Sequence, residues 1–137
     1  MESNKNIPVL VTGASGYIAS HLIKILLERG HKVRGTVRSL SNRSKYEFLY
    51  RLAPEKNDNL TLVEADLTDR ASWPAAVEGC EYIFHIASPI PPYVPKDENE
   101  LIGPAVAGTV NVLEAAAEKG AKKVVVTIGR RNRTAYG

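Results

Sequence analysis

Short apolar segments alternate with segments of helical periodicity along most of this 137-residue chain. Runs of mainly apolar and β-branched residues predict strands at 7–12, 32–37, 60–63, 82–86 and 123–127. Helical spacing of apolar residues predicts helices near 16–29, 41–52, 72–77 and 97–119. Strands that alternate with helices indicate βαβ units, in which a parallel sheet is covered on both faces.

The helical segments also predict which side chains face the core. In the first helix, the apolar residues with a spacing of four, and so the predicted inner stripe, are Ile18, Leu22 and Leu26. In the last helix, the residues predicted to be buried are Thr109, Val112, Leu113 and Ala116. Glycine commonly follows a helix C-terminus, and these two helices are followed by Gly30 and Gly120.

Few strand orders are compatible with this pattern, because crossovers between parallel strands are right-handed. The natural order is 3-2-1-4-5, which gives an α/β fold with a Rossmann-type, doubly wound parallel sheet. Apolar periodicity stops after Thr127. We therefore expect one domain at 1–127, truncated after its fifth strand, and a divergent, disordered basic tail at 128–137.

Charge and composition narrow the classes of partner. The formal charge is +3, and Arg130, Arg131 and Arg133 account for the excess, so the rest of the chain is neutral. A nucleic-acid-binding protein more often spreads basic residues over one face, so we expect no nucleic-acid partner. No apolar run approaches the length of a membrane span, and the single cysteine, Cys80, forms no internal disulfide. These features predict a soluble, cytoplasmic protein.

A glycine-rich turn between the first strand and the first helix carries the strongest chemical signal. The segment Thr12–Ala19 has the pattern Gly-x-x-Gly-x-x-Ala. The first glycine permits a tight turn, the second permits close approach of a pyrophosphate, and the alanine lets the helix pack near the sheet. The helix N-terminus offers free N–H groups to phosphates. The predicted dinucleotide-binding residues of the turn are Gly13, Ser15, Gly16, Tyr17 and Ile18.

The residues after the second strand predict which dinucleotide is bound. Proteins that bind NAD tend to place Asp or Glu here, whereas this chain has Arg38. A guanidinium suits the additional 2′-phosphate of NADP(H), and Lys45 could add a second positive charge. Arg43 is a competing candidate for that second position. The sequence therefore predicts NADP(H) in preference to NAD(H).

Two further strand ends predict contacts along the cofactor. Asp66 and Leu67 follow the third strand, where they either border the adenine pocket or form a local turn. The backbone of Ile86, Ala87 and Ser88 follows the fourth strand and should line the path from pyrophosphate to nicotinamide. His85 lies in an apolar strand without other ligands at metal-binding spacing, so we expect a packed, hydrogen-bonded histidine and no metal site.

These motifs together resemble the dihydroflavonol reductase and cinnamoyl-CoA reductase branch of the extended short-chain dehydrogenase/reductases. The resemblance runs from about Pro8 to Thr127, and its motifs are Val11–Ala19, Val33–Arg38, Asp66–Leu67, Ser72–Trp73, Gly79–Cys80, Phe84–Pro89 and Gly108–Ala116. It implies NADPH-dependent reduction of a carbonyl group, or the reverse oxidation of an alcohol. It also implies that Arg38 and Lys45 bind the 2′-phosphate.

The chain departs from that family after the fifth predicted strand. The family has Thr-Ser-Ser there, whereas Thr127 is followed by Ile128 and Gly129, and the family's Tyr-x-x-x-Lys pair has no counterpart before Gly137. We therefore expect an N-terminal half without catalytic residues, which meets a small-molecule substrate only when the missing half is supplied. The alternative is a non-catalytic NADP-binding module, or a half-domain completed by a partner or by self-association through its exposed sheet edge.

Overall fold

The computed structural model describes residues 7–86 and 99–126, with the side chains of the last helix described from residue 107. The strands are β1 (Val9–Val11), β2 (Val33–Val37), β3 (Leu60–Glu64), β4 (Tyr82–His85) and β5 (Lys123–Val126). The α-helices are α1 (Tyr17–Glu28), α2 (Trp73–Val77) and α3 (Asn99–Glu118). Short 3-10 helices are η1 (Arg43–Lys45), η2 (Glu47–Arg51), η3 (Pro54–Asn59) and η4 (Arg70–Ser72).

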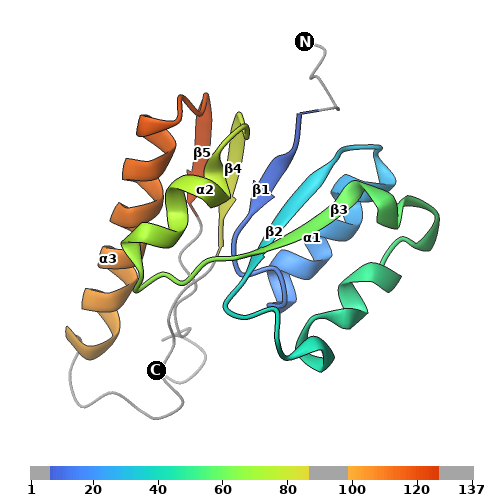
Figure 1. Cartoon of the computed structure of the whole chain (residues 1–137), viewed down its shortest axis with the longest axis horizontal. Helices are drawn as coiled ribbons and strands as arrows, with labels where there is room; N and C mark the ends of the chain where they lie inside the picture. Colours follow the sequence, from blue (N-terminus) through green and yellow to red (C-terminus); the bar gives the residue numbers. More distant parts are fainter. Residues whose placement is uncertain (1–6, 87–98, 127–137) are drawn as a thin grey trace, which may run out of the picture.

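The five strands form one parallel sheet in the order β3-β2-β1-β4-β5, as the sequence predicted. Strand β1 lies at the centre, where Val11 is paired with Gly35 of β2 on one side and Phe84 of β4 on the other. All strands point the same way, so the turns that follow β1, β2 and β3 meet at the carboxyl edge of the sheet (Figure 1).

Helices cover the sheet from both sides and form two hydrophobic cores (Figure 1). On one side, α1 and the stretch that contains η1, η2 and η3 pack on β1, β2 and β3. This core includes Val11, Ile23 and Leu49. On the other side, α2 and α3 pack around Leu10 and Trp73. Side chains of β1 alternate between the two cores, as the pleat of a strand requires. The glycine turn is thus anchored by a strand that is buried on both faces.

The prediction of the buried stripe of α1 was wrong, because the buried residues lie one position further along the chain. Ala19, Ile23 and Leu27 are fully buried, whereas Leu22 and Leu26 are only partly buried and Ile18 is 55% exposed. Both series have a spacing of four, so the periodicity identifies the helix without fixing which of two adjacent stripes faces inward. The small Ala19 lies against the sheet because the turn brings the start of the helix close to it.

A continuous helix predicted at 41–52 is replaced by the 3-10 helices η1 and η2. Between them, Tyr46 has φ −130°, which is incompatible with an α-helix. Hydroxyl groups nearby bond locally: the Ser41 backbone N–H donates to Ser39 Oγ at 3.2 Å, and Ser44 Oγ donates to Asn42 Oδ1 at 2.8 Å. Such bonds compete with helical ones, so the segment forms short turns that still bury Tyr46 and Leu49.

The buried side of α3 matched the prediction in part. Val112 and Ala116 are buried, but Leu113 is 42% exposed and Ala115 is buried instead. Thr109 is half-buried and contacts the sheet through a hydrogen bond to His85. This packing places the middle of α3 beside the carboxyl edge of the sheet, where the predicted site residues Asp66 and Leu67 lie.

Candidate cofactor-binding site

The glycine turn is held against β2 by hydrogen bonds to a single buried residue. The Gly13 backbone N–H donates to Thr36 Oγ1 at 3.0 Å, and the Ala14 N–H donates to the Thr36 carbonyl at 2.8 Å. Gly13 has φ 63°, a left-handed conformation that favours glycine. The Gly16 N–H then donates to the Gly13 carbonyl at 2.9 Å, which closes the turn.

Gly35 on β2 lets the turn approach the sheet. A Cβ at this position would lie 2.8 Å from Ala14 Cβ and 3.0 Å from Leu62 Cδ2. Neither Gly35 nor Thr36 was identified as a site residue from the sequence. The available signal was a glycine inside a strand, which often marks a close backbone approach. Both residues shape the turn without being exposed at it.

Helix α1 begins with an unneutralised positive end. Gly16 is its N-cap and provides no side-chain cap, and the first turn contains no acidic residue. The first N–H groups of a helix have no intrahelical acceptor, and the helix dipole adds partial positive charge there. Ser15 and Gly16 are exposed, Tyr17 is 79% exposed and Ile18 is 55% exposed. These predicted residues therefore surround an accessible helix N-terminus, a feature that suits an anion.

Arg38 is exposed at the carboxyl end of β2, next to the turn that follows β3. Its side chain forms no ion pair with the residues that the structure describes. It is close enough to Asp66 for its charge to contribute to lowering the pKa of that carboxyl group. The structure thus brings the predicted phosphate ligand and one predicted adenine residue together.

The two candidates for a second positive charge differ in their partners. Arg43 Nε lies 4.0 Å from Glu47 Oε2, so this guanidinium is already neutralised in part. The Lys45 side chain is exposed and has no ion pair within the described part of the chain. No contact joins Lys45 to Arg38 or Asp66, and its role stays a prediction.

The Asp66 carboxylate forms a local turn, which was the alternative interpretation of this segment. Asp66 Oδ1 accepts hydrogen bonds from the Thr68 N–H at 2.9 Å and from Thr68 Oγ1 at 2.7 Å. The backbone N–H of Thr68 lowers the pKa of Asp66 most, followed by the Thr68 hydroxyl and then by the charge of Arg38. The carboxylate therefore remains charged at neutral pH and is half-exposed at the sheet edge.

The backbone of this segment is held from three directions. Trp73 Nε1 donates to the Asp66 carbonyl at 2.9 Å, and the Asp66 N–H donates to Ser72 Oγ at 3.1 Å. From α3, Asn111 Nδ2 donates to the Leu67 carbonyl at 2.9 Å. The sequence placed Ser72 at the start of a short helix and Asn111 in a motif, and it assigned neither residue a bond to this turn; the Ser72 side chain does not cap α2. Because these bonds join α2 and α3 to one turn, that turn is rigidly positioned.

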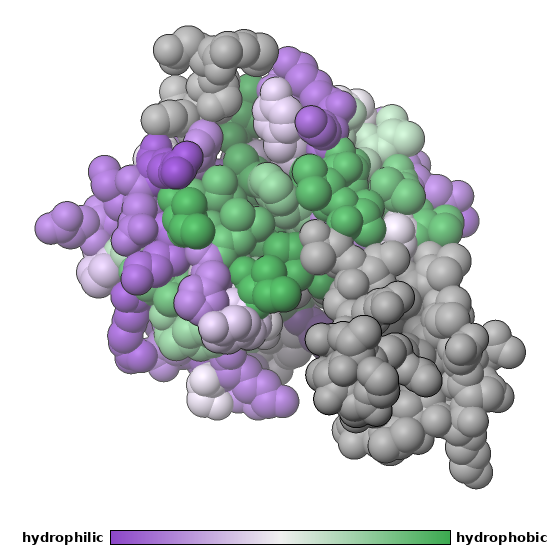
Figure 2. Space-filling view, turned by 180° about the vertical axis from the view of Figure 1, so that it is seen from behind, coloured by the Kyte–Doolittle hydropathy of each residue, from purple (hydrophilic) through white to green (hydrophobic). Residues whose placement is uncertain are grey.

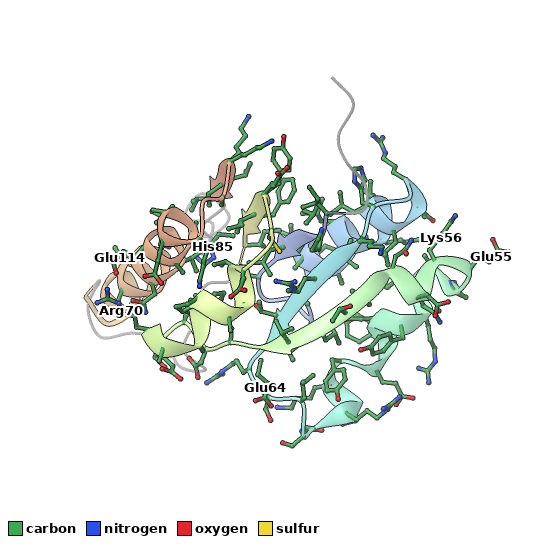
Figure 3. All side chains as sticks on the ribbon, turned by 45° about the horizontal axis from the view of Figure 1, so that its top comes forward. Glu55, Lys56, Glu64, Arg70, His85 and Glu114 are labelled. Atoms are coloured by element: carbon green, nitrogen blue, oxygen red, sulfur yellow. The ribbon has the colours of Figure 1, made fainter. Side chains whose placement is uncertain are left out.

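His85 connects the ends of β1 and β4 to α3 (Figure 3). Its Nδ1 lies 3.0 Å from Thr12 Oγ1, and its Nε2 lies 3.1 Å from Thr109 Oγ1. Thr12 Oγ1 also accepts a hydrogen bond from the Ile86 N–H at 2.9 Å. The imidazole is 1% exposed, and burial lowers the pKa of His85 to about 4. The prediction of a packed, hydrogen-bonded histidine is confirmed, and the ring is neutral at pH 7.

Of the three residues predicted to follow the cofactor after β4, the structure describes only Ile86. Ile86 is half-buried beside Thr12, while Ala87 and Ser88 lie outside the described residues. In the ranges 7–86 and 99–126, no three metal-ligating side chains gather, and no helix is long and apolar enough to cross a membrane. Cys80 is buried, and burial raises the pKa of its thiol.

Comparison with known proteins places these features in one family. The model of the NAD dependent epimerase/dehydratase family matches residues 9–129. A putative anthocyanidin reductase of Ginkgo biloba is 47% identical over 121 residues, and cinnamoyl-CoA reductase 1 of Petunia hybrida is 49% identical over 119 residues. Each alignment covers 87% of this chain, which spans 35% and 34% of those two relatives.

Solved structures show the same arrangement. Gre2 of Candida albicans in complex with NADPH superposes with a TM-score of 0.73 and 36% identity, over 88% of this chain and 36% of that protein. Vestitone reductase of alfalfa, Medicago sativa, gives a TM-score of 0.67 and 36% identity, over 87% of this chain and 35% of that protein. The matched family model extends over most of the chain, from β1 past β5. The chain therefore belongs to the NAD dependent epimerase/dehydratase family.

Proposed function

We propose that this chain is the NADP(H)-binding portion of an oxidoreductase that interconverts a carbonyl group and an alcohol. The observation that carries the proposal is the position of Arg38. Its guanidinium is exposed and forms no ion pair within the described chain, and it stands where an NAD-binding protein would have an acidic residue. Gre2 of Candida albicans, a structural relative, was solved with NADPH.

Each part of the proposed site matches one part of the cofactor. The start of α1, from Ser15 to Ile18, would hold the pyrophosphate with N–H groups and the helix dipole. Arg38 and Lys45 would neutralise the 2′-phosphate. The turn at Asp66 and Leu67, fixed by α2 and α3, would border the adenine. When bound, the nicotinamide ring supplies a hydride for transfer to the carbonyl carbon.

The chain's own contribution is to bind and orient this cofactor. His85 is the titratable group in β4 closest to the proposed nicotinamide path, and its buried neutral ring makes it a poor proton donor at pH 7. We therefore propose that this chain is catalytically incomplete, and that proton transfer and substrate selection need residues that the chain does not contain. A mixture of the chain, NADPH and a panel of aldehydes and ketones should then show no loss of absorbance at the reduced nicotinamide band. Turnover would refute this part of the proposal.

Calorimetric titration with NADPH and with NADH tests the cofactor assignment. The wild-type chain should bind NADPH more tightly, and Arg38→Ala should weaken NADPH binding by about 10- to 100-fold, as expected for a charge-assisted phosphate contact. Arg43→Ala tests the competing candidate and should weaken NADPH binding less than Arg38→Ala, because the Arg43 guanidinium lies 4.0 Å from Glu47 Oε2. Equal affinity of the wild-type chain for NADPH and NADH would refute the assignment.

A second candidate function is a module that is completed by another polypeptide. The face turned away in Figure 1 carries a broad hydrophobic surface (Figure 2). Exposed apolar residues of the described chain include Ile18 and Ile25 of α1 and Val125 and Val126 of the edge strand β5. Exposed apolar surface and an edge strand favour pairing with another chain. Sedimentation of the purified chain as a monomer over a wide concentration range would argue against self-association.

A further inference from the structure

The loop between β2 and η1 is fixed at Leu40 by two hydrogen bonds, one from its backbone N–H and one to its carbonyl. The Leu40 N–H donates to Glu64 Oε2 at 2.7 Å, and Tyr46 Oη donates to the Leu40 carbonyl at 2.7 Å. Glu64 ends β3 and lies beside this loop (Figure 3). Tyr46 is a buried member of the core under α1. We refer to Glu64, Leu40 and Tyr46 as the Leu40 clamp.

The clamp acts on the short backbone segment that carries Arg38. On one side of Arg38, Val37 pairs with Glu64 in the sheet, and its carbonyl accepts a hydrogen bond from the Ala65 N–H at 3.0 Å. On the other side, Leu40 is held by the Glu64 carboxylate. Arg38 and Ser39 therefore span two points that are both fixed to the end of β3. The backbone under the guanidinium has little freedom to move away from the sheet edge.

This arrangement has a consequence for cofactor selection. A loop residue that must be ordered on binding loses affinity through the entropy of ordering, whereas a preorganised loop does not. The 2′-phosphate is the feature that distinguishes NADP(H) from NAD(H), and Arg38 is its proposed ligand. Resting on the proposed function, we infer that Glu64 and Tyr46 are positioning residues that set the preference for NADPH over NADH by holding Leu40.

Glu64 is an acidic residue near the proposed phosphate site. A carboxylate at the end of β3 would by charge alone disfavour a phosphate. In this structure, Glu64 Oε2 is engaged with a backbone N–H, where its role is to accept a hydrogen bond. A neutral acceptor of the same shape should therefore serve as well. Glutamine provides that acceptor, and alanine does not.

The test compares Glu64→Gln with Glu64→Ala. Both variants lack the carboxylate charge, but only glutamine keeps a side-chain oxygen that can accept the hydrogen bond of the Leu40 N–H. NADPH should bind Glu64→Ala about 3- to 10-fold more weakly than Glu64→Gln, the effect of one hydrogen bond, and NADH should bind both alike. Tyr46→Phe keeps the buried ring and should lose NADPH affinity to a similar extent. Tyr50→Phe, a neighbouring tyrosine outside the clamp, is the control and should match the wild-type chain.

A second background separates positioning from general stability. In Arg38→Ala, the loop has no guanidinium to position, so Glu64→Ala and Glu64→Gln should bind NADPH equally. If the ratio of NADPH affinity to NADH affinity is the same in Glu64→Ala, Glu64→Gln and Tyr46→Phe as in the wild-type chain, the inference is overturned. The proposed function would remain intact. If the wild-type chain shows no preference for NADPH, the proposed function fails, and the inference fails with it. A drop in affinity for both cofactors alike would also overturn it, since that marks a structural effect.

Discussion

The buried imidazole of His85 predicts an acid sensitivity of folding in a defined pH range. The ring is 1% exposed and lies between Thr12 and Thr109, and its pKa is about 4 against an ordinary value of 6.5. Below pH 6.5 the unfolded chain binds a proton at this ring, and the folded chain does not until the pH reaches about 4. The unfolded state is thus favoured as the pH falls, so the free energy of unfolding must decrease across this range.

The magnitude follows from the difference between the two pKa values. A difference of one proton changes the free energy of unfolding by about 1.4 kcal/mol per pH unit. Between pH 6.5 and 4, the total loss should be about 3 kcal/mol, which is a large part of the stability of a small domain. Asp66 acts in a separate range, because its lowered pKa contributes stability that is lost only as the pH falls below its ordinary value of 3.8.

Urea unfolding at a series of pH values from 7.5 to about 4, followed by circular dichroism, measures this slope. His85→Gln should unfold at lower urea concentration at pH 7 and should lose the extra slope between pH 6.5 and 4. His21→Gln, which replaces an exposed histidine on α1, is the control and should keep the slope of the wild-type chain. An identical pH dependence in the wild-type chain and in His85→Gln would refute the reasoning.

Three further substitutions test the supports of the site. Gly35→Ala places a methyl group 2.8 Å from the glycine turn, so urea unfolding should show a loss of about 1–3 kcal/mol; unchanged stability would contradict the packing. Trp73→Phe removes the hydrogen bond to the Asp66 carbonyl and part of a fully buried side chain, so the free energy of unfolding, measured by circular dichroism, should fall by about 2–4 kcal/mol. Asn111→Ala frees the Leu67 carbonyl and should weaken NADPH and NADH binding equally in calorimetry, because both cofactors carry the adenine ring. A selective effect on NADPH would contradict a role in holding the adenine ring.

The fold was predictable because several local signals agreed. Five apolar runs, the glycine turn and the right-handed crossover rule together leave few strand orders, and the natural one among them is the observed order. The phase of α1 was not predictable, because Ile18 and Ala19 both begin apolar series with a spacing of four. Only packing against the sheet decides between them, and it favours the smaller residue where the helix lies closest.

The exposed parts of the candidate site were easier to predict than the residues that support it. Arg38 and Asp66 were found from their places after strands, and the structure brings their charges close together. Thr36 and Asn111 act through hydrogen bonds to backbone groups 23 and 44 residues away in the sequence, and Trp73 acts through a bond to a carbonyl 7 residues away. Such contacts leave no periodic signal, since they depend on where the turns meet in space. The replacement of a predicted helix by η1 and η2 has a different, local origin, because hydrogen bonds of nearby hydroxyl groups outweighed its apolar spacing.

We propose that the carboxyl edge of this sheet binds NADP(H). The most direct test is a titration of the chain with each cofactor, followed by amide ¹⁵N–¹H spectra. Addition of NADPH should shift the amide resonances of Gly13 to Ile18, of Arg38 and of Asp66 and Leu67, with saturation at one equivalent. Addition of NADH should shift the glycine turn and the Asp66 turn but leave Arg38 nearly unchanged. Shifts that are absent from these three segments, or that are the same at Arg38 for both cofactors, would contradict the claim.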